Sequence, residues 1–113
     1  MAWLDENEPG LRILKLAGPF TMTAVFEFQA AVREPAPCAT VIDFTDVPYM
    51  DSAALGSLLG MHVSYQSHNR HYALVGVSDR IRSLFRMSGV HGFLVTVDSL
   101  EQVRTLSANS ASA

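Results

Sequence analysis

The sequence predicts a single α/β domain with a mixed, mostly parallel sheet and the element order β-β-α-β-α-β-α-β-α. Two patterns predict this fold class. First, runs of β-branched and aromatic residues alternate with segments whose apolar residues recur at helical spacing, as in the crossover units that join parallel strands. Second, a short turn that contains Pro9 and Gly10 separates the first two strands, which adds an antiparallel edge to the sheet.

The composition is that of one globular domain. The chain has 113 residues, of which 49% are hydrophobic and 17% are charged, and a chain of this length can bury a core without disulfides or metals. We expect the domain to span residues 1–106 and the small, polar residues 107–113 to form a flexible tail.

Charge, cysteine content and hydropathy limit which kinds of binding partner and which cellular compartment are expected for this protein. The formal net charge of −3 gives no electrostatic footprint for nucleic acid. Cys38 is the only cysteine, so an internal disulfide is impossible and a reducing compartment is favoured. No apolar run approaches the roughly 20 residues that span a bilayer, and the acidic first residues lack the features of a signal peptide. We therefore expect a cytoplasmic protein that does not insert into membranes.

The expected elements follow from turn residues and from the spacing of apolar side chains. Strands are expected at 2–5, 11–18, 40–46, 72–77 and 93–97, and helices at 21–34, 52–67 and 79–89. Gly18 and Pro19 end the second strand. The first helix is predicted from a set of residues at helical spacing. This set is Met22, Val25, Phe26 and Gln29.

The second half of the chain carries clearer boundary signals. The run "TVIDFTD" (40–46) is continuously apolar at its centre, which is typical of a strand buried on both faces. Ser78 is expected to cap the helix at 79–89, and Gly89 to end it. The stripe expected along this helix is Ile81, Leu84, Phe85 and Ser88. Ser99 and Gln102 match a capping box that begins a final helix.

The junction before residues 52–67 holds two candidate capping residues. A helix N-terminus leaves backbone N–H groups without partners, and the side chain of Asp51 or of Ser52 could satisfy one of them. A structural role is therefore expected for one of the two. Capping does not explain why both are present.

Small residues gather on one face of the helix at 52–67. The small face consists of Ala53, Gly56, Ser57, Gly60 and Ser64, and the face expected in the core of Ala54, Leu55, Leu58, Leu59, Met61, His62 and Tyr65. Two glycines inside one helix cost about 1 kcal/mol each relative to alanine. A smooth face lets another backbone approach, either from a neighbouring helix or from a partner protein, and both alternatives stay open.

Two stretches of the sequence resemble the STAS domain family, which includes the anti-sigma-factor antagonists. "DFTDVPYMDSAALGSLLG" (43–60) is similar to the family's strand, loop and helix signature. "ALVGVSDRIRSLFRMSGV" (73–90) is similar to a later strand and helix, with the ending F-x-x-S-G. The order of elements is also similar, so the resemblance covers most of the chain and implies a STAS-like fold.

The resemblance implies a phosphorylation switch. In the phospho-regulated antagonists, the Ser that follows the motif Asp is phosphorylated by an anti-sigma factor with serine-kinase activity, and this position is Ser52 here. The unphosphorylated antagonist binds the anti-sigma factor, and phosphorylation prevents binding. The implied partner-binding residues are Asp51, Ser52, Ala53, Gly56, Ser57, Gly60 and Thr21.

This chain departs from the family pattern at two places. Ala54 stands where the family usually has Gly. The loop that often reads Gly-Glu-Leu-Asp reads Gly-Pro-Phe-Thr here, so Thr21 occupies the position of the acidic residue that often lies near the phosphorylation site.

Enzymatic, metal and nucleotide functions are not expected. Ser52, His62 and Asp43 contain the residue types of a hydrolase triad, but the pattern G-x-S-x-G is absent around Ser52. The four histidines lack zinc-type spacing, and Cys38 has no second cysteine. Glycine-rich phosphate-binding loops are also absent. We expect a protein with no catalytic activity, metal or cofactor.

Two alternatives concern protein binding. Arg80, Arg82 and Arg86 project between the core positions of their helix, either as a solvated face or as a partner-binding patch beside the Ser52 helix. The chain could also serve as an accessory subunit of a transport complex or signalling assembly, with Ser52 as a cap or contact. STAS-like domains are known in both kinds of role.

Overall fold

A computed structural model of the chain describes residues 1–4, 11–34 and 39–98. It contains a five-stranded sheet in the order β1-β2-β3-β4-β5. The strands are β1 (Ala2–Leu4), β2 (Leu11–Ala17), β3 (Ala39–Asp46), β4 (Tyr72–Val75) and β5 (Thr96–Val97). The helices are α1 (Val25–Arg33), α2 (Ser52–Ser67) and α3 (Asp79–Met87), and the short 3-10 helix η1 (Met22–Ala24) precedes α1.

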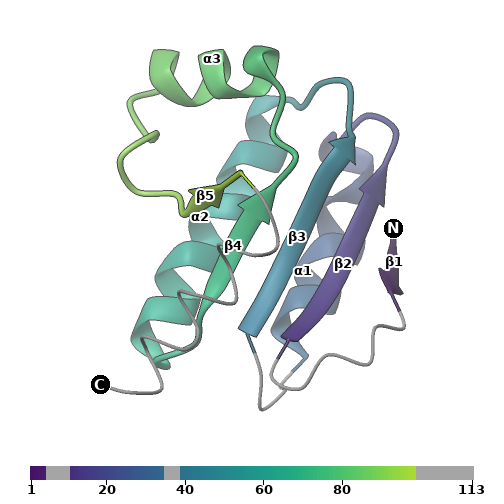
Figure 1. The fold of residues 1–113 in the computed structure, drawn as a ribbon, viewed down its shortest axis with the longest axis vertical. Coiled ribbons are helices and arrows are strands. Elements are labelled where there is room, and N and C mark those ends of the chain that lie inside the picture. The colour runs from purple at the N-terminus through teal and green to yellow at the C-terminus, as the bar shows by residue number, and fades with distance from the viewer. Residues whose placement is uncertain (5–10, 35–38, 99–113) are drawn as a thin grey trace.

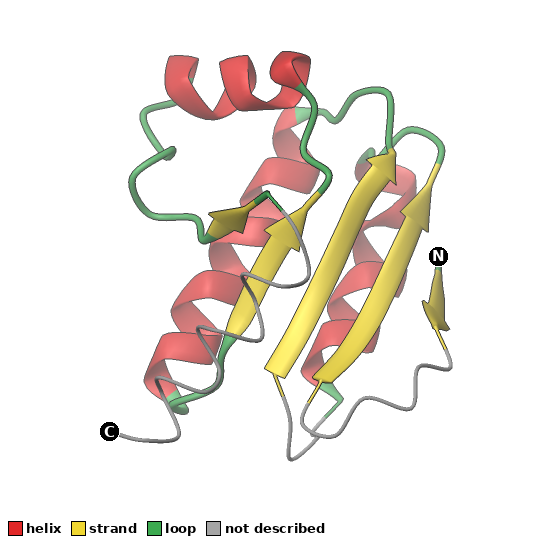
Figure 2. Ribbon diagram, in the orientation of Figure 1, coloured by secondary structure: helices red, strands yellow, loops and turns green. Residues whose placement is uncertain are grey.

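The sheet confirms the predicted fold class. Strand β1 pairs with β2 antiparallel, and β2, β3, β4 and β5 pair in parallel. Helices α1 and α2 lie on one face of the sheet, and α3 lies across the end towards which β2, β3 and β4 point (Figures 1 and 2). The loops from β2 to α1 and from β3 to α2 both lie at this carboxyl end of the strands (Figure 1).

Both faces of the central strand carry buried apolar residues, as its continuous apolar run predicts. Val41 and Ile42 are adjacent in β3, and both are 0% exposed. Ile42 belongs to the cluster between the sheet and the helices, and Val41 to a smaller cluster on the opposite face. The smaller cluster consists of Leu11, Ile13, Val41, Ala73, Val75 and Val97.

Helix α1 is confirmed, but the residues that predicted it are not its buried face. Phe28 and Val32 are the buried residues of α1. Met22 and Phe26 are 67% and 82% exposed. The segment contains two apolar sets at helical spacing, and the sheet can cover only one of them. The set with Phe28 packs into the core between the sheet and the helices, where the Phe28 ring centre lies 5.0 Å from that of Phe20.

The last strand is shorter than predicted. Pairing with β4 involves only Thr96 and Val97, and residues 91–93 form a turn in which the N–H of Phe93 donates to the carbonyl of Val90. The strand propensity of 93–95 is therefore overridden by the turn after α3. The final helix expected from Ser99 and the tail at 107–113 lie outside the described residues.

Candidate functional site

Two loops meet at the carboxyl end of the sheet. The backbone N–H of Phe20 donates to the carbonyl of Tyr49 (3.0 Å), and the N–H of Asp51 donates to the carbonyl of Phe20 (3.2 Å). These bonds hold the loop after β2 against the loop before α2. Thr21 therefore lies beside the N-terminus of α2, although the two segments are about thirty residues apart in the sequence.

Asp51 is the N-cap of α2, and it also holds the neighbouring loop. Its Oδ1 accepts a hydrogen bond from the N–H of Ala54, and its Oδ2 accepts one from the N–H of Met22, each at 2.9 Å. The bonds from Ala54 and Met22 favour the charged form and lower the pKa of the Asp51 carboxyl below its usual value of 3.8. Of the two candidate caps, Asp51 performs the capping, and one carboxylate organises both loops.

Ser52 is left free by this arrangement. It is the first residue of α2 and is exposed. Within the described part of the chain, the Ser52 hydroxyl has no hydrogen-bond partner. The structure therefore separates the two adjacent polar residues into a structural carboxylate and an accessible hydroxyl at a helix N-terminus.

The small face of α2 is only partly open. Ala53, Gly56 and Gly60 are exposed. Ser57 is 6% exposed, and its Oγ donates to the carbonyl of Ala54 at 2.6 Å. The expectation that Ser57 stands open to a partner is therefore corrected, because the turn of α2 directs this hydroxyl inward against its own helix.

The two glycines of α2 do not serve close packing inside the described domain. A Cβ at Gly56 or Gly60 would meet no atom of another described element within 4 Å. A smooth face could admit either a helix of the same domain or a partner protein. At Gly56 and Gly60 the first explanation therefore finds no support. Approach by a partner remains a prediction.

Met22 and Phe26 extend the exposed surface beside Asp51, and the sequence reasoning missed them. The Met22 N–H is bonded to the cap, and Phe26 follows about one turn later. Val63, Met87 and Phe93 are also exposed, so the distinguishing feature of Met22 and Phe26 is their place beside the cap of α2. The sequence signal that could have identified them is that the segment of η1 and α1 carries two apolar sets at helical spacing, of which the sheet can cover only one. We call Thr21, Met22, Phe26, Ser52, Ala53 and Gly56 the carboxyl-edge surface.

The three arginines of α3 differ in their surroundings. The guanidinium of Arg80 lies 5.6 Å from the ring centre of Tyr49, in the loop that leads to α2. Arg82 lies 3.6 Å from Asp98, and Arg86 is exposed. Only Arg80 is thus positioned near the junction before α2.

The residues of the rejected triad are kept apart by their elements. His62 faces the core, where its Nδ1 lies 2.7 Å from the hydroxyl of Tyr72. It follows Ser52 by ten residues of one helix, which is about 15 Å at 1.5 Å per residue. The Asp43 carboxylate accepts from the backbone and hydroxyl of Thr45. Absence of catalytic activity stays a prediction.

Metal-binding clusters and membrane-spanning helices are absent from residues 1–4, 11–34 and 39–98. These ranges contain no group of three or more His, Cys, Asp or Glu side chains that could hold a metal ion. None of their helices is long and apolar enough to cross a membrane.

The mixed sheet, the helices on one face and the loop-and-helix surface at the carboxyl end of the strands make this a small α/β domain (Figure 1). The STAS domain family model matches residues 3–103. The chain belongs to the STAS domain family, which confirms the resemblance in the sequence.

Curated relatives match part of the chain. The anti-sigma-B factor antagonist of Listeria monocytogenes is 41% identical over 49 residues, which are 43% of this chain and 43% of the relative. That of Staphylococcus aureus is 28% identical over 71 residues, or 63% of this chain and 66% of the relative. The matched segments therefore span less than two thirds of the relatives' length.

Solved structures share the fold. A candidate anti-sigma factor antagonist of Thermotoga maritima gives a TM-score of 0.82 at 13% identity, covering 95% of this chain and 93% of the other. The unphosphorylated anti-sigma factor antagonist SpoIIAA gives 0.71 at 20%, covering 93% and 96%. A sulfate transporter family protein of Wolinella succinogenes gives 0.79 at 17%, covering 94% and 91%. Antagonists and transporter proteins thus share this fold.

Proposed function

We propose that this protein is a cytoplasmic, non-enzymatic anti-sigma-factor antagonist that binds an anti-sigma factor with serine-kinase activity and is switched off by phosphorylation at Ser52. The observation that carries the proposal is the free, exposed hydroxyl of Ser52 beside the fully engaged carboxylate of Asp51. Partial matches to anti-sigma-B factor antagonists, which are 41% identical over 49 residues in Listeria monocytogenes, support the class of partner.

The binding surface includes apolar as well as small residues. Met22 and Phe26 offer large exposed side chains, and Ala53 and Gly56 offer a flat helix face beside Ser52. Protein interfaces place apolar anchors at their centre and exclude water around them. A partner that covers this surface would bring its own atoms against the Ser52 hydroxyl.

A phosphate on Ser52 would act on the complex rather than on the fold. It would add about −1.5 to −2 charges at neutral pH. At the first residue of α2, the free N–H groups and the positive end of the helix dipole favour this charge. The ionised Asp51 next to it and a partner surface built for a neutral hydroxyl oppose it. A penalty of roughly 2–4 kcal/mol would weaken binding by a factor on the order of 30 to 1,000.

The test captures partners from a lysate of the source organism with three baits: wild type, Ser52→Asp and Ser52→Ala. We expect a kinase-like anti-sigma factor on wild type and Ser52→Ala, and its loss on Ser52→Asp. Circular dichroism should be the same for all three proteins, because Ser52 is exposed. An unfolded Ser52→Asp variant would contradict the electrostatic account.

The same experiment tests the alternative of an accessory subunit in a transport complex or signalling assembly. The shared fold of the Wolinella succinogenes sulfate transporter family protein, with a TM-score of 0.79, makes this alternative worth testing. Capture of the same transport or scaffold proteins by wild type and Ser52→Asp would favour the accessory subunit and overturn the switch.

A further inference from the structure

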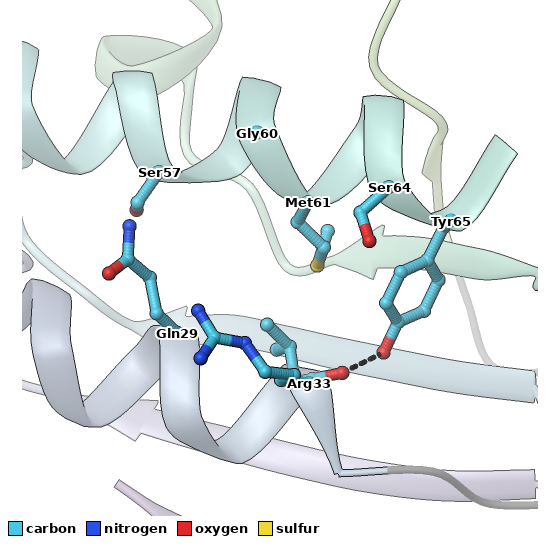
Figure 3. Close-up of a pocket in the computed structure, with 8 residues that line it drawn as sticks. Gln29, Arg33, Ser57, Gly60, Met61, Ser64 and Tyr65 are labelled. Atoms are coloured by element: carbon cyan, nitrogen blue, oxygen red, sulfur yellow. Dashed lines mark hydrogen bonds between the residues drawn. The ribbon is translucent and has the colours of Figure 1, made fainter. Parts of the chain in front are cut away.

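The groove between α1 and α2 contains a cavity whose lining includes no residue of the carboxyl-edge surface. Its volume is about 250 Å³. Residues of both helices line it, and the outer ones, Arg33, Gly60 and Ser64, are exposed, so solutes have direct access (Figure 3).

Three polar side chains at this cavity have no partner within the described part of the chain. They are the amide of Gln29, the guanidinium of Arg33 and the hydroxyl of Ser64. The guanidinium extends towards Gln29, and the Ser64 hydroxyl points into the space between the helices (Figure 3). Arg33 is the one charged residue among those that line the cavity. The polar side therefore offers hydrogen-bond donors and a single positive charge.

The guanidinium group of Arg33 lies away from the C-terminal end of α1 (Figure 3). Arg33 is the last residue of α1, where unpaired carbonyls carry partial negative charge that opposes an anion. Its side chain, however, runs back along the helix towards Gln29 (Figure 3). An anion held by this guanidinium would therefore lie beside the body of the helix and away from those carbonyls.

The floor of the cavity is apolar. Met61 and Tyr65 are 4% and 2% exposed. The Tyr65 hydroxyl donates to the carbonyl of Val32 at 2.7 Å, so it is already engaged. What Met61 offers a ligand is a thioether, which makes favourable contacts with aromatic rings.

We propose that this cavity binds a small aromatic carboxylate. The carboxylate would form paired charge-assisted hydrogen bonds with Arg33, with Gln29 and Ser64 as further donors. The ring would lie against Met61. Gly60 lines the cavity and leaves its mouth open because it has no side chain. A Cβ at this position would meet nothing within 4 Å, so a larger residue would extend into this free space.

Benzoate is the probe, and the amide shifts of the labelled full chain in ¹H–¹⁵N NMR spectra are the readout. We expect saturable shifts centred on α1 and α2 around the cavity, with a dissociation constant on the order of millimolar. Benzyl alcohol lacks the carboxylate and acetate lacks the ring, so each should bind about tenfold more weakly or worse. Shifts that do not saturate, or that centre on the loop before α2, would overturn the proposal.

Two matched pairs of variants complete the test. Arg33→Gln should weaken benzoate about tenfold, whereas Arg86→Gln, the same change at an exposed position of α3, should leave it unchanged. Gly60→Leu should block the cavity, and Gly56→Leu, on the same helix outside the cavity lining, should not. The same spectra report whether each variant is folded. Equal affinity of Arg33→Gln and wild type would refute the site, and this result would leave the Ser52 proposal untouched.

Discussion

The hydroxyl of Ser52 is accessible to solvent because the side chain of Asp51, and not that of Ser52, caps helix α2. Both carboxylate oxygens are engaged, one by the Ala54 N–H of α2 and the other by the Met22 N–H of the loop after β2. A serine cap would have directed its own oxygen into the helix. Placing a carboxylate before the serine therefore secures the helix and the loop while the next hydroxyl stays accessible.

Asp51→Asn tests this assignment through its dependence on pH. The amide has one acceptor oxygen where the carboxylate has two, so the urea midpoint should fall at neutral pH. Because the folded-state pKa of Asp51 lies below its unfolded value near 3.8, the contribution of the charged form is complete above that value. It is lost as the pH falls through the folded-state pKa. The midpoints of wild type and Asp51→Asn should therefore converge in acid.

Asp79→Asn is the matched control, since Asp79 lies in the first turn of α3 and Ser78 caps that helix. It should give a smaller loss at neutral pH. A gap between wild type and Asp51→Asn that stays constant down to acid pH would contradict the role given to the charged carboxylate.

At the scale of elements, Tyr72 of β4 joins α2 to the edge of the sheet. Its hydroxyl accepts a hydrogen bond from the N–H of Val95 at 3.2 Å and lies 2.7 Å from Nδ1 of His62. The tautomer of His62 decides which of these two atoms donates to the other. Burial raises the pKa of Tyr72 above its usual value of 10.0, so the hydroxyl keeps its proton. The residue just before the short strand β5 is thus linked to α2 through Tyr72.

Tyr72→Phe should cost about 1–3 kcal/mol of unfolding free energy, because it leaves the Val95 N–H and the His62 ring without their buried partner. Urea unfolding measures the loss. Tyr49→Phe removes the same hydroxyl from a ring that is 42% exposed, and it should change stability by less than about 0.5 kcal/mol. Equal effects of the two substitutions would show that the buried link contributes nothing.

At the scale of the molecule, the carboxyl-edge surface gathers residues from three parts of the chain. The loop after β2, the first turns of α1 and the first turns of α2 all reach the same end of the sheet (Figure 1). The parallel arrangement causes this convergence, because every crossover that follows a parallel strand begins at the carboxyl end. Sites on parallel sheets commonly lie there for that reason.

Phe26→Ser tests whether the exposed apolar residues serve partner binding. It should weaken binding of the captured anti-sigma factor about tenfold to thirtyfold, with stability changed by less than about 0.5 kcal/mol, because Phe26 is 82% exposed. Met87→Ser, at an 87% exposed residue of α3, should leave affinity unchanged. Binding constants from calorimetry would decide, and an unaffected Phe26→Ser would remove Phe26 from the interface.

The sequence predicts the parts of this molecule that depend on local signals. Helix α2 begins at Ser52, as the capping residues and the helical period indicate, and Asp51 supplies the cap. Long-range packing decides the rest. The sheet selects Phe28 over Phe26 on α1, and the turn at 91–93 after α3 leaves β5 with only Thr96 and Val97. The inward hydroxyl of Ser57 and the free hydroxyl of Ser52 likewise needed three-dimensional geometry.

The central claim is that Ser52 receives the phosphate, and the most direct measurement is the intact mass of the protein after incubation with the captured partner and ATP. We expect wild type to gain the mass of one phosphate, Ser52→Ala to gain none, and Ser52→Thr to regain it, since threonine restores a hydroxyl at the start of α2. Phosphate on Ser52→Ala, or unmodified wild type in the presence of a partner that binds both ATP and the protein, would contradict the account.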